Sequence, residues 1–113
     1  MKVRGKEIKF LRTVQTTIDL IEIAPDKDAN RITELFTGSV DTVLKNGAVL
    51  IHSLNKGYEM SKHREDPTYE PQIISVEDIM YLSQEQFNEL LNEAIKEFTN
   101  VETTVETEKS KKK

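Results

Sequence analysis

The sequence predicts a mainly α-helical domain with a short N-terminal β-hairpin, a small α+β fold in which four to five helices pack around a central helix at 39–57. Apolar residues recur at helical spacing through this stretch, and the same period returns from Phe87 to Phe98. The chain has 113 residues, which is enough for one domain with one core. We therefore expect a single globular domain at 1–98.

Residues 1–12 are predicted to form the hairpin. Gly5 suits a turn in which the backbone takes a positive φ. Ile8 and Phe10 alternate with Lys9, which gives the strand one buried and one solvent-exposed face. A frayed N-terminus is the alternative, because a lone hairpin is marginally stable.

Residues 13–24 favour a helix with Thr13 as its N-cap. This helix ends before Pro25, because the residue that precedes a proline avoids the α region. A strand is the rival interpretation, since β-branched residues are frequent here. The apolar positions that suit the helix are Val14, Ile18, Leu20 and Ile21.

A short helix is expected at 29–36, with Asp28 as its cap. Gly38 stops it in a left-handed conformation, and Ser39 then caps the central helix.

The central helix is predicted to end at Lys56-Gly57, because glycine is the usual residue just past a helix C-terminus. Gly47 lies on the apolar stripe of this helix and suggests that another backbone comes close there, with a kink as the alternative. The stripe consists of Val40, Val43, Leu44, Gly47, Leu50, Ile51, Leu54 and Tyr58.

Residues 58–74 are predicted to form a mobile surface loop, because prolines and alternating charges leave this stretch almost nothing to bury. Ser75 then caps a short helical turn, and Ser83 caps the last helix. Beyond Phe98 the helical period stops, so a disordered charged tail is expected at 99–113.

His52 and His63 are the residues from which a catalytic or metal site would have to start. His52 borders the apolar stripe and is most simply a half-buried packing residue, whereas His63 lies in a solvated charge run. Glu59 and His63 share a face only if the central helix continues past Gly57, and no third ligand at zinc spacing is evident. We therefore expect no metal site, no cofactor and no enzyme activity.

Composition and charge disfavour other classes of function. Without cysteine, the chain has neither a disulfide framework nor a thiolate metal site. No apolar run approaches the roughly 18 residues of a membrane span, and the N-terminus lacks the apolar region of a signal peptide. The net charge of −4 disfavours nucleic acid as a partner, and nearby glutamates offset the lysines at 109–113.

Tyrosine and methionine side chains in or beside the predicted loop are candidates for protein binding. The alternative is that they cover the edge of the core. These candidates are Tyr58, Met60, Tyr69 and Tyr81.

The order of these features carries more information than any one of them. A GKEIKF hairpin precedes a Thr-Val helix, and then come NGAVLIHSLNKGYE, a proline-containing loop, ISVEDIMYLSQEQFNELLNEAIKEF and a tail of threonine, glutamate and lysine. In this order, from Gly5 to Lys113, the chain resembles the tail assembly chaperones of long-tailed, siphovirus-type phages and prophages of Gram-positive bacteria.

The resemblance implies a non-catalytic protein that binds the tape-measure protein and assists tail-tube assembly, with the tail-tube protein as a further candidate partner. It also implies self-association, a location in the cytoplasm of the infected bacterial host, and absence from the mature virion. A programmed ribosomal frameshift commonly yields an extended product in this family, and A-rich codons at Lys111, Lys112 and Lys113 would suit one.

Two other functions stay as alternatives. Gly38-Ser39 between two helices loosely resembles the turn of a helix-turn-helix, which would make the chain a small helical regulatory or DNA-binding protein. The helix that follows offers only Lys45 and Lys56 as cations, however, and a recognition helix needs phosphate-contacting and base-reading side chains. A minor structural virion protein is the second alternative.

Overall fold

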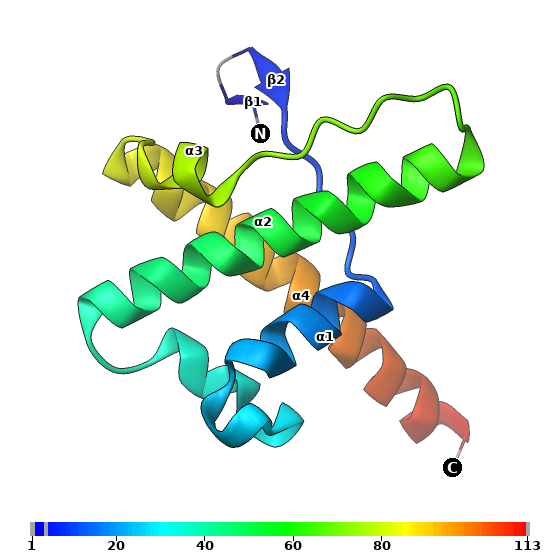
Figure 1. The fold of residues 1–113 in the computed structure, drawn as a ribbon. Helices are drawn as coiled ribbons and strands as arrows, with labels where there is room; N and C mark the ends of the chain where they lie inside the picture. The colour runs from blue at the N-terminus through cyan, green and yellow to red at the C-terminus, as the bar shows by residue number, and fades with distance from the viewer. Residues whose placement is uncertain (1, 4, 113) are drawn as a thin grey trace.

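The computed structural model describes the backbone of residues 2–3 and 5–112, and the side chains of those residues up to 99. It is mainly helical with a two-stranded antiparallel hairpin at the N-terminus, so the predicted fold class is confirmed (Figure 1). In chain order the elements are β1 (Lys2–Val3), β2 (Lys6–Glu7), α1 (Val14–Ile23), the 3₁₀ helices η1 (Pro25–Lys27) and η2 (Ala29–Phe36), α2 (Val40–Glu65), α3 (Val76–Met80) and α4 (Gln84–Lys112).

α2 is the central element, as the sequence predicts. It contacts α1, η2, α3 and α4, and Figure 1 shows it crossing the whole molecule with α4 behind it. Leu50, Ile51 and Leu54 on its apolar stripe are all 0% exposed. Because burying each such side chain stabilises the fold by about 1.5–3 kcal/mol, this stripe accounts for much of the core.

The end of α2 differs from the prediction, because the helix continues past Gly57 to Glu65. Gly57 is buried inside the helix, and a Cβ at this position would overlap the carbonyl oxygen of Leu11. The glycine therefore permits a close backbone approach and is not a C-cap.

The prediction of a close backbone at Gly47 is wrong for a related reason. A Cβ placed there would lie 3.0 Å from Cδ1 of Leu91 and 3.2 Å from Cζ of Phe87, so the neighbours are side chains of α4. Both glycines permit tight packing, but only Gly57 faces another segment's main chain.

The N-terminal hairpin is present, so the frayed alternative is wrong, although the strands are shorter than the predicted 1–12. Lys2 pairs with Glu7 and Val3 with Lys6, and Gly5 between them has a φ of 81°. The chain after β2 then runs without a strand partner over α2. The Leu11 amide donates to the Leu54 carbonyl at 3.0 Å, which fixes this segment to the central helix.

α1 confirms the helical interpretation of residues 13–24 and excludes the strand. Thr13 and Thr16 form a reciprocal capping box, in which each backbone amide donates to the other side chain at 3.2 Å. Ala24, just before Pro25, has left the helical region, as expected for a residue before proline.

The next short helix begins where predicted but is a 3₁₀ helix. The amide of Asn30 donates to the Asp28 carboxylate at 2.9 Å, so Asp28 is the cap. Gly38 has a φ of 100°, in the region that glycine alone adopts without strain. Ser39 occupies the N-cap position of α2, but its hydroxyl contacts the side chains of Asp41 and Thr42 and caps no amide.

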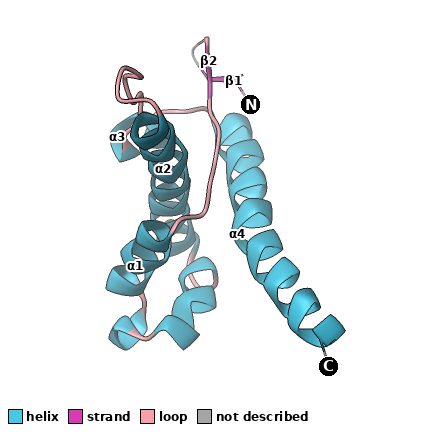
Figure 2. Ribbon diagram, turned by 90° about the vertical axis from the view of Figure 1, so that its right-hand side faces the viewer, coloured by secondary structure: helices cyan, strands magenta, loops and turns pink. Residues whose placement is uncertain are grey.

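Serine residues cap the last two helices as predicted. The hydroxyl of Ser75 accepts from the Asp78 amide at 3.0 Å, and that of Ser83 accepts from the Gln86 amide at 3.1 Å. The backbone of α4 is helical to Lys112, where the sequence predicts a disordered tail at 99–113; residue 113 lies outside the described residues. Glutamate and lysine are strong helix formers, and a helix already nucleated by packing extends easily. The C-terminal end of α4 points away from the other helices (Figure 2).

No helix in the described part of the chain combines the length and apolar character that crossing a bilayer requires.

Candidate protein-binding surface

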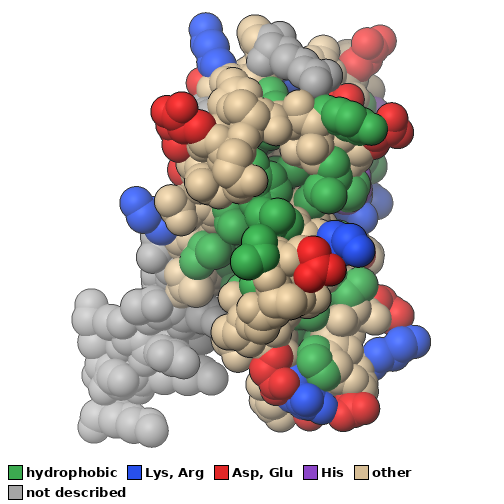
Figure 3. All heavy atoms as spheres, turned by 90° about the vertical axis from the view of Figure 1, so that its left-hand side faces the viewer, with side chains coloured by type: hydrophobic (Ala, Val, Ile, Leu, Met, Phe, Trp, Pro, Cys, Tyr) green, Lys and Arg blue, Asp and Glu red, His purple; other side chains and the backbone are tan. Residues whose placement is uncertain are grey.

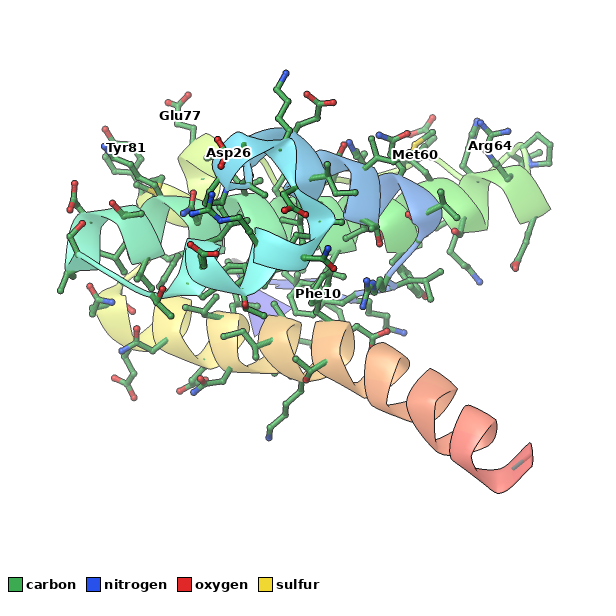
Figure 4. All side chains as sticks on the ribbon, turned by 90° about the horizontal axis from the view of Figure 1, so that it is seen from below. Phe10, Asp26, Met60, Arg64, Glu77 and Tyr81 are labelled. Atoms are coloured by element: carbon green, nitrogen blue, oxygen red, sulfur yellow. The ribbon has the colours of Figure 1, made fainter. Side chains whose placement is uncertain are left out.

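The four residues predicted to bind a protein do not form one patch. Tyr58 is half-buried under the Lys9 ammonium, which lies 5.7 Å from the ring centroid. Tyr69 is half-buried and held by a hydrogen bond to α2, as described below. Met60 and Tyr81 lie towards opposite ends of the molecule (Figure 4). Tyr81, directly after α3, is 77% exposed and is the most exposed of the four.

A row of polar side chains follows one face of α2. His52, Asn55, Glu59 and His63 are spaced by three, four and four residues, which places them on the same side of a helix. Asn55 is 0% exposed and Glu59 is 3% exposed, although both side chains are polar. Buried polar groups of this kind require hydrogen-bond partners, and the row finds them in the segment after α2.

Glu59 and Asn55 hold the backbone of that segment, which we call the strap (residues 66–75). The Glu59 carboxylate accepts from the Tyr69 hydroxyl at 2.7 Å and from the Gln72 amide at 2.9 Å. The Asn55 side chain accepts from the Ile74 amide at 2.8 Å and donates to the carbonyl of Lys9 at 3.0 Å. Asn55 therefore joins the strap and the N-terminal segment to one point on α2.

The two histidines complete the row. Nδ1 of His52 lies 2.8 Å from the Ile74 carbonyl oxygen, and Nδ1 of His63 lies 2.8 Å from the Tyr69 carbonyl oxygen. Since a carbonyl oxygen can only accept, Nδ1 of each ring carries the proton. His52 is therefore more than a packing residue. The charge run around His63 is exposed, as predicted, but His63 itself is half-buried and bonded to the strap.

These contacts revise the predicted loop at 58–74. Its first part belongs to α2, and the rest lies in the strap, which is anchored at Tyr69, Gln72 and Ile74. The hydrogen bond to Glu59 also raises the pKa of Tyr69 to about 12, because the neighbouring carboxylate disfavours the phenolate. The strap is thus tied to α2 at these points, although Ile74 is its one buried residue.

An open apolar groove lies between the first turn of α1 and the C-terminal half of α2. Its volume is about 560 Å³, and Val14 on its rim is 79% exposed. The lining residues are Thr13, Val14, Gln15, Lys56, Gly57, Met60, Ser61 and Arg64. We call this surface the α1–α2 groove. Of the predicted protein-binding residues, Met60 is the one that lines it.

The outward face of α1 continues the apolar surface from the groove. Leu20 and Thr16 are 0% exposed and face the core, whereas Ile18, one turn after Val14, is 44% exposed. The apolar positions 14 and 18, which suit a helix in the sequence, therefore point outward. Sequence reasoning missed Val14 as a binding residue, because the burial of Thr16 on the opposite face of α1 is seen only in the structure.

A second apolar surface lies between η2 and α4. Figure 3 shows the face at the N-terminal end of α2, with a band of hydrophobic side chains through its middle. A hollow of about 190 Å³ opens beside α4, and Val40, at the start of α2, is 74% exposed. The hollow is lined by Ile32, Thr33, Phe36, Leu50, Ile95, Phe98 and Thr99.

Within the described residues, no group of three or more histidine, aspartate or glutamate side chains is placed to hold a metal ion. Comparison of the chain with known proteins found no matching family model, no similar curated protein and no similar solved structure.

Proposed function

We propose that this protein is a phage tail assembly chaperone that binds the tape-measure protein through the α1–α2 groove and assists tail-tube assembly without catalysis. The observation that carries the proposal is the order of sequence features from Gly5 to Lys113, which resembles that of such chaperones. The exposed apolar groove supports the proposal, because a chaperone needs an apolar surface to cover the hydrophobic helices of its client.

The chaperone acts in the cytoplasm of the infected bacterium and leaves before the virion is mature. It binds apolar segments of the tape-measure protein as they are made, keeps them from aggregating, and releases them as the tube polymerises around them. Self-association around the client, with the tail-tube protein as a further partner, would extend the covered surface beyond one groove.

Co-expression with the tape-measure gene tests the proposal. The soluble yield of the tape-measure protein is expected to rise, and the two proteins are expected to co-purify. The variant Val14→Asp should abolish both effects, because it places a carboxylate on the rim of the groove.

Val40→Asp is the matched control. Val14 and Val40 are the first residues of α1 and α2, and they are 79% and 74% exposed. An aspartate in the first turn is favourable in both helices, so the two variants should be equally well folded. Unchanged solubility of the client and no co-purification with the wild-type chain would refute the function. Loss of binding with Val40→Asp alone would move the site from the groove to the surface around the start of α2.

A further inference from the structure

We propose that the α1–α2 groove binds an amphipathic α-helix that carries a carboxylate opposite Arg64. The inference rests on the proposed chaperone function for the source of that helix, but the charge and shape of the groove define its chemistry. The partner is thus a helix with an apolar face flanked by aspartate or glutamate.

One wall of the groove is a line of residues along α2. Lys56, Met60 and Arg64 are spaced by four residues each, so they follow one side of the helix over about 12 Å. Figure 4 shows Met60 and Arg64 near the C-terminal end of α2. An apolar side chain therefore lies between two cationic ones.

The two cations differ in what they already bind. The Lys56 ammonium lies 2.9 Å from the Asp19 carboxylate, so its charge is matched within the chain. Arg64 is exposed and makes no hydrogen bond or ion pair with any residue whose side chain the structure describes. Its guanidinium is therefore available to a partner, and a guanidinium binds a carboxylate through two parallel hydrogen bonds.

The opposite wall carries charge of the same sign. It is formed by Thr13, Val14 and Gln15 at the start of α1, where the helix dipole gives a partial positive charge. The first turn of α1 contains no acidic residue to offset this charge. An acidic partner is thus favoured on both sides of the apolar centre, although the whole chain has a net charge of −4.

A helix fits this groove better than an extended peptide does. A helix satisfies its own backbone hydrogen bonds, whereas an extended peptide would turn unpaired amides and carbonyls towards Val14 and Met60. The helix can place apolar side chains between these two residues and a carboxylate one or two turns further along, at Arg64.

Two synthetic amphipathic peptides test the inference with the full-length chain. Both carry the same leucine pattern, and their polar positions are glutamate in one and lysine in the other. The glutamate peptide is expected to bind about tenfold more tightly than the lysine peptide, as measured by fluorescence anisotropy. Arg64→Glu should erase or reverse this preference.

Lys62→Glu is the control, because it changes the net charge equally at an exposed position on α2 that does not line the groove. The control should keep the wild-type preference. Equal binding of both peptides, binding of neither, or equal effects of the two substitutions would overturn the inference. So would a dimer of the chain that Arg64→Glu dissociates, because a second copy would then fill the groove.

The peptide assay and the co-expression test can give negative results independently of each other. A tape-measure protein made soluble by the chain, together with peptides that bind without preference, would refute only the carboxylate at Arg64. A clear peptide preference without any effect on the tape-measure protein would refute only the chaperone function.

Discussion

At the scale of single residues, the two glycines of α2 show how much depends on what lies opposite a missing side chain. Gly57 faces a carbonyl oxygen, which belongs to a segment already tied to α2 by the Leu11 amide. Gly47 faces the ends of the Leu91 and Phe87 side chains, which can rotate. The same substitution should therefore have different effects at the two positions.

We expect Gly57→Ala to destabilise the fold by about 2 kcal/mol or more, because the new methyl group must displace backbone. Gly47→Ala is the matched control and should change the free energy of unfolding by less than about 1 kcal/mol, since alanine's helix propensity offsets the crowding. Urea denaturation of both variants measures this. A Gly57→Ala protein as stable as the wild type would contradict the close approach of the Leu11 carbonyl.

Tyr69 gives a prediction about pH. Its pKa in the folded state is raised to about 12 by the hydrogen bond to Glu59, above the usual value of 10.0. A raised pKa means that folding favours the protonated phenol, so its stabilising contribution is complete below pH 10 and is lost as the pH rises through 12. Unfolding curves between pH 9 and 12 should therefore show a loss that Tyr69→Phe lacks. Identical pH profiles of the two proteins would exclude the hydrogen bond.

At the scale of elements, the strap shows that a segment with few apolar residues can still be fixed. Its anchors are side chains of α2 that bind backbone groups, and a buried hydrogen bond of this kind contributes about 0.5–1.5 kcal/mol. Glu59 serves two donors at once, from Tyr69 and Gln72. Removing it leaves both without an acceptor.

Glu59→Ala is accordingly expected to lower the free energy of unfolding by about 2–4 kcal/mol. The amide of Gln72 should also exchange with solvent faster than in the wild type, because it loses its acceptor. Nuclear magnetic resonance measures both the exchange and the integrity of the rest of the fold. Glu93→Ala, at an exposed position of α4, is the control and should change neither quantity. An unaltered Gln72 amide in Glu59→Ala would contradict the anchoring.

The sequence predicts elements well where the signal is local. Thr13, Ser75 and Ser83 are recognisable as caps because a cap bonds to amides two or three residues away. The end of α2 was not predictable in this way. A glycine that ends a helix and a glycine that admits a neighbouring backbone look alike in sequence, and only the position of Leu11 distinguishes them at Gly57.

The candidate site also depends on contacts that are not local in the sequence. The spacing of His52, Asn55, Glu59 and His63 is present in the sequence, but it forms one face only because α2 continues to Glu65. Met60 was predicted as a binding residue from its type and its place in the predicted loop. Val14 and Arg64 complete the groove with it, and no local signal joins residues from α1 and α2 that lie so far apart in the chain.

At the scale of the whole molecule, the packed part of α4 includes Phe98, which is 6% exposed. Arg12 binds α4 at this residue, because its guanidinium stacks 3.8 Å from the Phe98 ring centroid and donates to the Phe98 carbonyl at 2.9 Å. The N-terminal segment and the packed part of α4 are thus joined directly. The distal part of α4 leaves the body of the molecule after this point (Figure 2).

This arrangement predicts that a chain ending at residue 104 keeps the stability of the full chain. The shortened chain retains Phe98 and the helical turn after it, so both contacts with Arg12 persist. Its free energy of unfolding in urea should match that of the full chain within about 0.5 kcal/mol, the usual range for changes away from the core. A larger loss would show that the distal part of α4 belongs to the core. Because the described residues that line the α1–α2 groove all lie before residue 65, the shortened chain should also retain the glutamate-peptide preference, and its loss would place part of the binding surface on α4.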